Sequence, residues 1–275
     1  MNALPAIAIS LCALLAACAT APPDAAVESL IAAETAFAKM GATQGVRASF
    51  LANFADDGIL FTPKPVLLHE RWIGRPPPAD PLAQQLSWKP AAAAVARSGE
   101  IGLTTVPSTF SVADSAQPPS YGIFTSVWRR DSSGRWQVVL DVGVSTPAPM
   151  TVEQLAPAPT LFPATDSNLA SPAEAERKLR GTANGAFAGL LAADARWYRD
   201  EQMPVLRRDE FVARFADAAP ALEITPDAEV IAASQDFAYT YGTLRTNGPD
   251  SARNYVHLWT RDAAGAWRIA VVVWP

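Results

Sequence analysis

The fold is decided by the stretch Trp128-Arg129-Arg130-Asp131-Ser132-Ser133-Gly134-Arg135-Trp136, because it returns as Trp259-Thr260-Arg261-Asp262-Ala263-Ala264-Gly265-Ala266-Trp267. These two stretches lie 131 residues apart. Upstream, Trp88–Thr104 and Ile224–Thr240 share Pro, Ala, Ser and Thr positions at a constant offset of 136. The two offsets differ by a change near Gln117–Ser120, which a hairpin loop can absorb. Shared order and spacing with a gap confined to a loop indicate a tandem repeat.

Each repeat unit has a helical pattern first and a strand pattern second. In the first unit, Val27–Lys39 places apolar residues at helical spacing, and Val46–Phe54 continues helically. A short strand is predicted at Gly58–Thr62. Four longer strands are predicted at Ala93–Ala96, Ile101–Phe110, Tyr121–Arg129 and Trp136–Val144. The pattern predicts an α+β fold with two similar units.

Composition limits the classes of function. The chain has 275 residues, of which 49% are hydrophobic and 18% charged, and this length predicts one or two globular domains, each large enough to bury a core. The net charge of −5 is spread over both halves without a basic stripe, so we expect no nucleic-acid partner. Only two histidines and no Gly-rich phosphate loop are found, so we predict no metal site and no cofactor.

The N-terminus carries the pattern of an exported lipoprotein. Residues 1–17 contain no charged side chain, are too short for a stable membrane span, and match the apolar region of a signal peptide. They end in Leu15-Ala16-Ala17-Cys18, which resembles a bacterial lipobox. We therefore expect lipidation of Cys18 and a membrane partner through that anchor. The absence of Asp after Cys18 predicts the outer membrane, with the protein facing the periplasm.

The predicted domain order follows from these patterns. Residues 18–26 are a short tether, and residues 27–145 form the first unit. The Pro- and Ala-rich segment 146–170 is the linker, because its prolines discourage regular structure. Residues 171–275 form the second unit, in which ionisable positions have been lost.

Several sequence elements resemble the nuclear transport factor 2-like superfamily, and more narrowly its SnoaL-like and exported, functionally unassigned (DUF-type) bacterial members. These elements are Ala32–Phe37, Phe54–Gly58, Leu86–Pro90, Ser98–Gly102 and Val127–Asp141. The resemblance implies two cone-shaped units, each with N-terminal helices packed in a strongly curved antiparallel sheet. It also implies that the units pair through their sheets as an intrachain pseudo-dimer. The superfamily hosts enzymes, binders and assembly modules, so the resemblance predicts a fold and no activity.

The candidate site lies in the cone of the first unit. We expect its pocket to be lined by six side chains: Phe54, Phe61, His69, Trp72, Trp88 and Tyr121. Candidates for a catalytic acid or base are Asp57, His69 and Asp141. Strict alternation from Trp136 and Val138 places Asp141 on the opposite face of the last strand. No superfamily catalytic motif matches closely enough to assign a role.

The leading hypothesis is non-catalytic binding of a small apolar or amphipathic ligand, or of a protein partner, in the first cone. An alternative is an isomerase, dehydratase or cyclase that uses a first-unit carboxylate or His69. That alternative predicts that Asp57 and His69 face one enclosed cavity. A third hypothesis, an assembly module without a ligand, predicts that both cones are filled.

Overall fold

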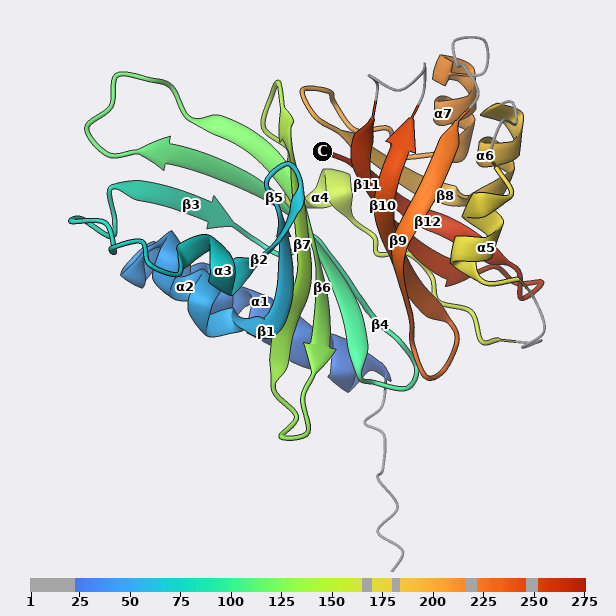
Figure 1. The fold of residues 1–275 in the computed structure, drawn as a ribbon, viewed down its shortest axis with the longest axis horizontal. Coiled ribbons are helices and arrows are strands. Elements are labelled where there is room, and N and C mark those ends of the chain that lie inside the picture. Colours follow the sequence, from blue (N-terminus) through green and yellow to red (C-terminus); the bar gives the residue numbers. More distant parts are fainter. Residues whose placement is uncertain (1–22, 165–169, 180–183, 216–221, 246–251) are drawn as a thin grey trace, which may run out of the picture.

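The computed structural model describes residues 23–164, 170–179, 184–215, 222–245 and 252–275. Within these ranges the chain forms two α+β units, each with helices packed against a strongly bent sheet (Figure 1). The predicted fold class is therefore confirmed. Cys18 and the predicted signal sequence lie outside the described residues. In the described part of the chain, no helix is both long and apolar enough to cross a membrane.

The first unit contains helices α1 (Pro23–Gln44), α2 (Val46–Asn53) and α3 (Leu68–Trp72). Its sheet order is β2 (Pro65–Leu67), β1 (Phe54–Phe61), β7 (Trp136–Thr146), β6 (Ser120–Arg130), β5 (Ile101–Val112) and β3 (Gln84–Trp88), with β4 (Ala92–Val95) also paired to β5. All pairs are antiparallel except β1 with β7. Residues 23–26 belong to α1, so the tether predicted for 18–26 is partly helical. The short strands β2 and β3 were not predicted.

The second unit repeats this plan with helices α5 (Pro172–Arg177), α6 (Asn184–Leu190) and α7 (Arg208–Phe215). Its sheet order is β8 (Leu191–Arg199), β12 (Trp267–Trp274), β11 (Arg253–Arg261), β10 (Phe237–Arg245) and β9 (Glu223–Ile231). The β8–β12 pair is parallel, as is the equivalent β1–β7 pair. The repeated glycines Gly134 and Gly265 both adopt a positive φ in their hairpin turns, a conformation that glycine accepts without strain.

Both sheets carry a β-bulge at the same place in the repeat. The register of β6 and β7 shifts between Val127 and Trp128, and that of β11 and β12 shifts between Leu258 and Trp259. A bulge adds one residue to one strand and increases the local bend. The repeated bulges therefore contribute to the curvature of both sheets and reset which side chains face the helices.

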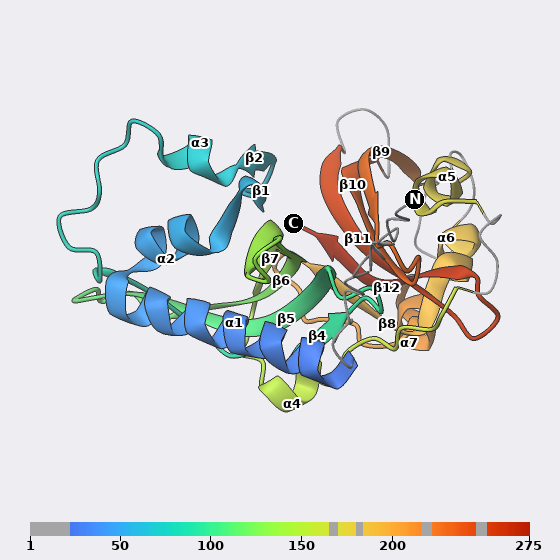
Figure 2. The same cartoon turned by 90° about the horizontal axis from the view of Figure 1, so that it is seen from below.

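The two units pack through the faces of their sheets that point away from the helices, as Figures 1 and 2 show. One hydrophobic cluster spans both units and includes Val142 and Val144 of β7 together with Val256, Leu258 and Val271 of the second sheet. Burial of this apolar surface supplies the main attraction between the units. Each unit in addition keeps its own core under its helices.

Polar contacts at the rim of this interface are reciprocal. The Ser98 N–H donates to Ser234 Oγ, and the Ser234 N–H donates to Ser98 Oγ, each at 3.1 Å. Ser98 and Ser234 occupy equivalent repeat positions, so this contact is isologous, as in a twofold dimer. Arg97 N–H donates to Asp236, and the equivalent contact runs from the N–H of residue 233 to Glu100. The expected intrachain pseudo-dimer is confirmed.

The segment between the units is partly folded onto them. It contains the short helix α4 (Val152–Leu155), which is capped by Thr151. Leu155 is fully buried and joins the hydrophobic cluster that spans both units. The Arg196 guanidinium donates to the carbonyl oxygens of Leu155 and Pro157. This part of the predicted linker is therefore held against the protein.

Candidate ligand-binding site

The first unit contains a cavity of about 330 Å³ between its sheet and the start of α2. This volume lies within the range of small-molecule sites. The lining is mixed apolar and polar: Val46, Phe61, Gln84, Leu86, Ser108, Phe110, Ser120, Tyr121, Gly122, Phe124, Gly143, Val144, Ser145 and Asp200. Asp200 follows β8, so the second unit contributes to the wall. Its carboxylate accepts hydrogen bonds from Ser145 N and Oγ at 2.8 and 2.7 Å.

A smaller pocket of about 10 Å³ lies deeper in the same unit. Its walls are formed by Glu34, Phe37, Phe50, Leu86, Trp88, Val106, Phe124, Ser126 and Asp141. Leu86 and Phe124 line both spaces, so these two side chains form the boundary between them. The deep pocket is large enough for one water-sized group.

Asp141 faces this deep pocket, and the face predicted for it was wrong. Trp136 and Val138 pack in the core under the helices, so strict alternation would point Asp141 away from them. The β6–β7 bulge inserts one residue between Val138 and Leu140, which reverses the alternation. Asp141 consequently shares the interior face with Trp136 and Val138.

The Asp141 carboxyl group is nearly fully buried, with an exposed fraction of 3%. Its Oδ2 accepts a 2.6 Å hydrogen bond from Ser126 Oγ, whereas Oδ1 has no partner among the described residues. Burial raises the pKa of Asp141 to about 7; the Ser126 hydrogen bond opposes this rise and the nearby Glu34 carboxylate adds to it. Asp141 can therefore exchange a proton near neutral pH.

Glu34 supplies a second buried carboxylate, from α1. Its two oxygens accept hydrogen bonds from Trp88 Nε1 at 2.5 Å and from Thr104 Oγ1 at 2.6 Å. Thr104 in turn accepts from Trp128 Nε1 at 3.0 Å. Burial raises the pKa of Glu34, and these hydrogen bonds from Thr104 and Trp88 oppose the rise.

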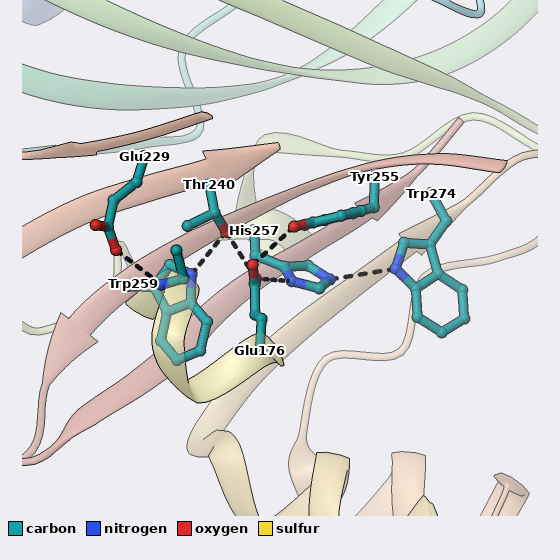
Figure 3. A network of polar contacts seen from close by, with 8 residues as sticks. Glu176, Glu229, Thr240, Tyr255, His257, Trp259 and Trp274 are labelled. Carbon is teal, nitrogen blue, oxygen red and sulfur yellow. Dashed lines mark hydrogen bonds and ion pairs between the residues drawn. The ribbon is translucent and has the colours of Figure 1, made fainter. Parts of the chain in front are cut away.

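The second unit repeats this Glu–Thr–Trp arrangement with Glu176, Thr240 and Trp259 (Figure 3). There the carboxylate gains two further donors, because Tyr255 Oη and His257 Nδ1 each lie 2.7 Å from a Glu176 oxygen. Trp274 Nε1 donates to His257 Nε2 at 3.3 Å. Because an indole nitrogen can only donate, Nε2 accepts this bond, and Nδ1 is the ring nitrogen that faces Glu176.

Among the described residues, three positions in the interior of the first unit carry small side chains where the second unit has large ones. Gly143 of the first unit corresponds to Trp274, Ser108 to Leu244, and Ser126 to His257. All three second-unit side chains are buried in the interior of their unit. Small side chains in the first unit thus leave space where large ones fill it in the second.

The predicted pocket residues divide into groups. Phe61 and Tyr121 line the outer cavity, and Trp88 lines the deep pocket. Phe54 is buried in the core and stacks on Phe50 at 5.4 Å between ring centroids. Trp72 lines a separate groove beside the proline-rich loop 75–81.

Asp57 and His69 do not face a common cavity. Asp57 forms an ion pair with Arg129 at 2.7 Å on the surface, and this hydrogen-bonded arginine lowers the Asp57 pKa. The His69 Nε2 lies 3.9 Å from a carboxylate oxygen of the fully exposed Asp56. Neither Asp57 nor His69 lines the outer cavity or the deep pocket. An acid–base pair formed by these two residues is therefore contradicted.

Two residues that shape the site were missed by the sequence analysis. Glu34 follows Leu30 by four residues and precedes Phe37 by three, so it lies on the buried face of its helix. An acidic residue at such a position signals a buried polar network. Gly143 was recognisable from the repeat, because its counterpart is the bulky Trp274.

Comparisons with known proteins give a likeness of fold. No family model and no curated protein matches the sequence. Solved structures do match. A ketosteroid isomerase-like protein from Erwinia carotovora atroseptica shows 14% identity and a TM-score of 0.35, covering 43% of this chain and 95% of its own. A nuclear transport factor 2-like superfamily protein from Salmonella enterica shows 11% identity and a TM-score of 0.36, covering 48% and 97%.

A nuclear transport factor 2-like protein of unknown function from Pseudomonas putida is also similar. It shows 16% identity and a TM-score of 0.33, covering 48% of this chain and 93% of its own.

Proposed function

We propose that this protein binds a small, largely apolar ligand in the cone of its first unit. The observation that carries the proposal is the contrast between equivalent interiors. The first holds a cavity of about 330 Å³ beside Gly143 and Ser108, whereas Trp274 and Leu244 fill the same places in the second. An unfilled interior lowers stability, so a retained cavity favours a binding role over a purely structural one.

The neutral fluorescent probe 6-propionyl-2-dimethylaminonaphthalene tests this proposal, because its emission shifts to the blue in an apolar site. We expect saturable binding by the wild-type protein. Ser108→Leu introduces the residue of the second unit and should weaken binding at least tenfold. Gly143→Ala should do the same, because its added Cβ would lie 2.5 Å from the Phe124 ring and displace that ring.

Thr109→Leu is the matched control, since Thr109 follows Ser108 on the same strand and points to the other face. It should leave probe binding unchanged. Absence of saturable binding by the wild-type protein would contradict the proposal, as would equal binding by the wild-type protein and Ser108→Leu.

We further propose that the protein is exported and anchored through a lipid on Cys18, at the outer membrane facing the periplasm. The support is the apolar segment 1–17 followed by Leu15-Ala16-Ala17-Cys18. Metabolic labelling with palmitate in a bacterial host should label the wild-type protein and not Cys18→Ser. Labelling that persists in Cys18→Ser would contradict the anchor.

A second candidate function is proton transfer on a bound ligand, and Asp141 is the observation that favours it. A pKa near 7 is suited to a general acid or base at neutral pH. Isomerisation of a β,γ-unsaturated ketone to its conjugated isomer can be followed by absorbance. Turnover that disappears in Asp141→Asn while the fluorescent probe still binds would support this function, and unchanged turnover would contradict it.

A further inference from the structure

The charged side chains that line the two adjacent spaces in the first unit are all acidic. Asp200 lines the outer cavity, and Glu34 and Asp141 line the deep pocket. Among the described residues that line either space there is no Lys, Arg or His. Acidic side chains would repel a ligand carboxylate or phosphate in both the outer cavity and the deep pocket, whereas they would attract a cation.

The hydrogen-bond inventory of the deep pocket gives an independent indication. Each side-chain donor already has an acceptor: Ser126 Oγ donates to Asp141, and Trp88 Nε1 and Thr104 Oγ1 donate to Glu34. When Asp141 is ionised, the hydrogen-bonding capacity that remains in the deep pocket consists of carboxylate lone pairs. The Asp141 Oδ1 is buried and has no donor among the described residues. A ligand group that pairs with ionised Asp141 must therefore donate hydrogen bonds.

The volume of the deep pocket limits which hydrogen-bond donor group of a ligand can enter it. The deep pocket holds about 10 Å³, which is room for one water-sized group. An alkylammonium head is compact, carries three donors and has no acceptor. A guanidinium group is larger and planar. The deep pocket therefore fits a primary ammonium group.

The outer cavity fits the rest of such a molecule. Phe61, Phe110 and Tyr121 contribute aromatic surface there, which packs against an apolar chain and also attracts cations. The boundary side chain Phe124 lies over Gly143, the residue paired with it on β7. Rotation of the Phe124 and Leu86 side chains would join the two spaces.

We propose that the first-unit cavity takes a primary alkyl or arylalkyl amine, with the ammonium group beside Asp141 and the apolar body in the outer cavity. The amine specificity rests on the proposed ligand-binding function. It deepens that function by naming the chemical class of the ligand. The negative charge of Asp200, which comes from the second unit, gives the mouth of the cavity the same preference.

The pH dependence of binding separates an amine from a carbonyl ligand. The titratable groups that face the deep pocket are Asp141 from β7 and Glu34 from α1, while Tyr121 and Asp200 line the outer cavity. An ammonium ligand pairs with ionised Asp141, so its affinity rises as pH increases to about 7. A carbonyl ligand accepts from protonated Asp141, so its affinity falls over the same range.

The experiment compares hexylamine, hexan-1-ol, hexanoate and hexan-2-one by isothermal titration calorimetry at pH 5.5 and pH 8. We expect hexylamine to bind at least tenfold more tightly than hexan-1-ol at pH 8, and hexanoate not to bind. Hexylamine affinity should fall about thirtyfold at pH 5.5, in proportion to the ionised fraction of Asp141. Asp141→Asn should remove the preference for the amine while binding of hexan-1-ol persists.

The outcomes distinguish the two proposals. If hexan-1-ol and the naphthalene probe bind while hexylamine shows no advantage, the amine proposal is overturned and the binding function stands. Tighter binding of hexan-2-one or hexanoate, or an amine preference that survives in Asp141→Asn, also overturns it. If none of these ligands binds, the proposed function itself fails.

Discussion

Replacing Asp141 with asparagine removes a buried carboxyl group while nearly preserving its shape. Burial raises the Asp141 pKa from 3.8 to about 7 in the folded protein. The folded state therefore holds this proton more tightly than the unfolded chain does. Stability is lost as pH rises from about 4 to about 7, at about 1.4 kcal/mol per pH unit, or about 4 kcal/mol in all.

The Asp141→Asn variant does not lose this stability, because asparagine does not ionise in this pH range. We expect it to match the wild-type protein near pH 4 and to be more stable by about 4 kcal/mol at pH 8. Urea unfolding followed by the fluorescence of the eight tryptophans measures this difference at pH 4, 6 and 8. Only the difference between the two proteins is interpreted, because Glu34 and other carboxyl groups titrate in both.

Asp57→Asn is the matched control, because the pKa of Asp57 is shifted in the opposite direction to that of Asp141. Its hydrogen-bonded partner Arg129 lowers the Asp57 pKa, so its contribution is present above pH 4 and is lost as pH falls further. The pair is exposed, so the variant should lose less than about 1 kcal/mol at pH 8. A stability difference for Asp141→Asn that is constant with pH, or that favours the wild-type protein at pH 8, would refute the reasoning.

Urea unfolding of other variants tests the contact between the two units, the buried network around Glu176 in the second unit, and the two repeated hairpin turns. Glu176→Ala leaves several buried donors without their acceptor and should cost about 3–5 kcal/mol; a loss under 1 kcal/mol would contradict the network. Ser98→Ala should cost about 1 kcal/mol, and Ser234→Ala should cost more because Ser234 Oγ also donates to Asp236; no loss in either variant would argue against the reciprocal contact. Gly134→Ala and Gly265→Ala should each cost about 1 kcal/mol, because both positions have a positive φ; a neutral effect would contradict the turn geometry.

Much of the fold could be predicted because the same sequence pattern occurs in both repeat units. The Trp-x-x-Asp-x-x-Gly-x-Trp hairpins and the period-2 strands between them are local patterns, and local sequence decides turns and, where no bulge intervenes, strand faces. The strands β2 and β3 escaped prediction because each is short and held mainly by pairing with a neighbour. Helix α1 exceeded its predicted start because its first turn packs residue Ala26 into the core.

The site was predicted only in part, because its residues meet across long sequence separations. Phe61, Trp88 and Tyr121 were recognisable as aromatic residues in or beside the predicted strands of the first unit. Asp57 and His69 take part in ion pairs with Arg129 and Asp56, and Trp72 lines another groove, because strand pairing and packing between distant segments decide where these side chains lie.

The amino-acid sequence by itself determined the repeat, the hairpins and the apolar faces, because these depend on spacing along the chain. Tertiary structure alone decided the environment of Asp141. One bulge turned this residue inward, and a second buried carboxylate from α1 came to lie near it. Burial and charge proximity set a pKa, and both exist only after distant segments have packed together.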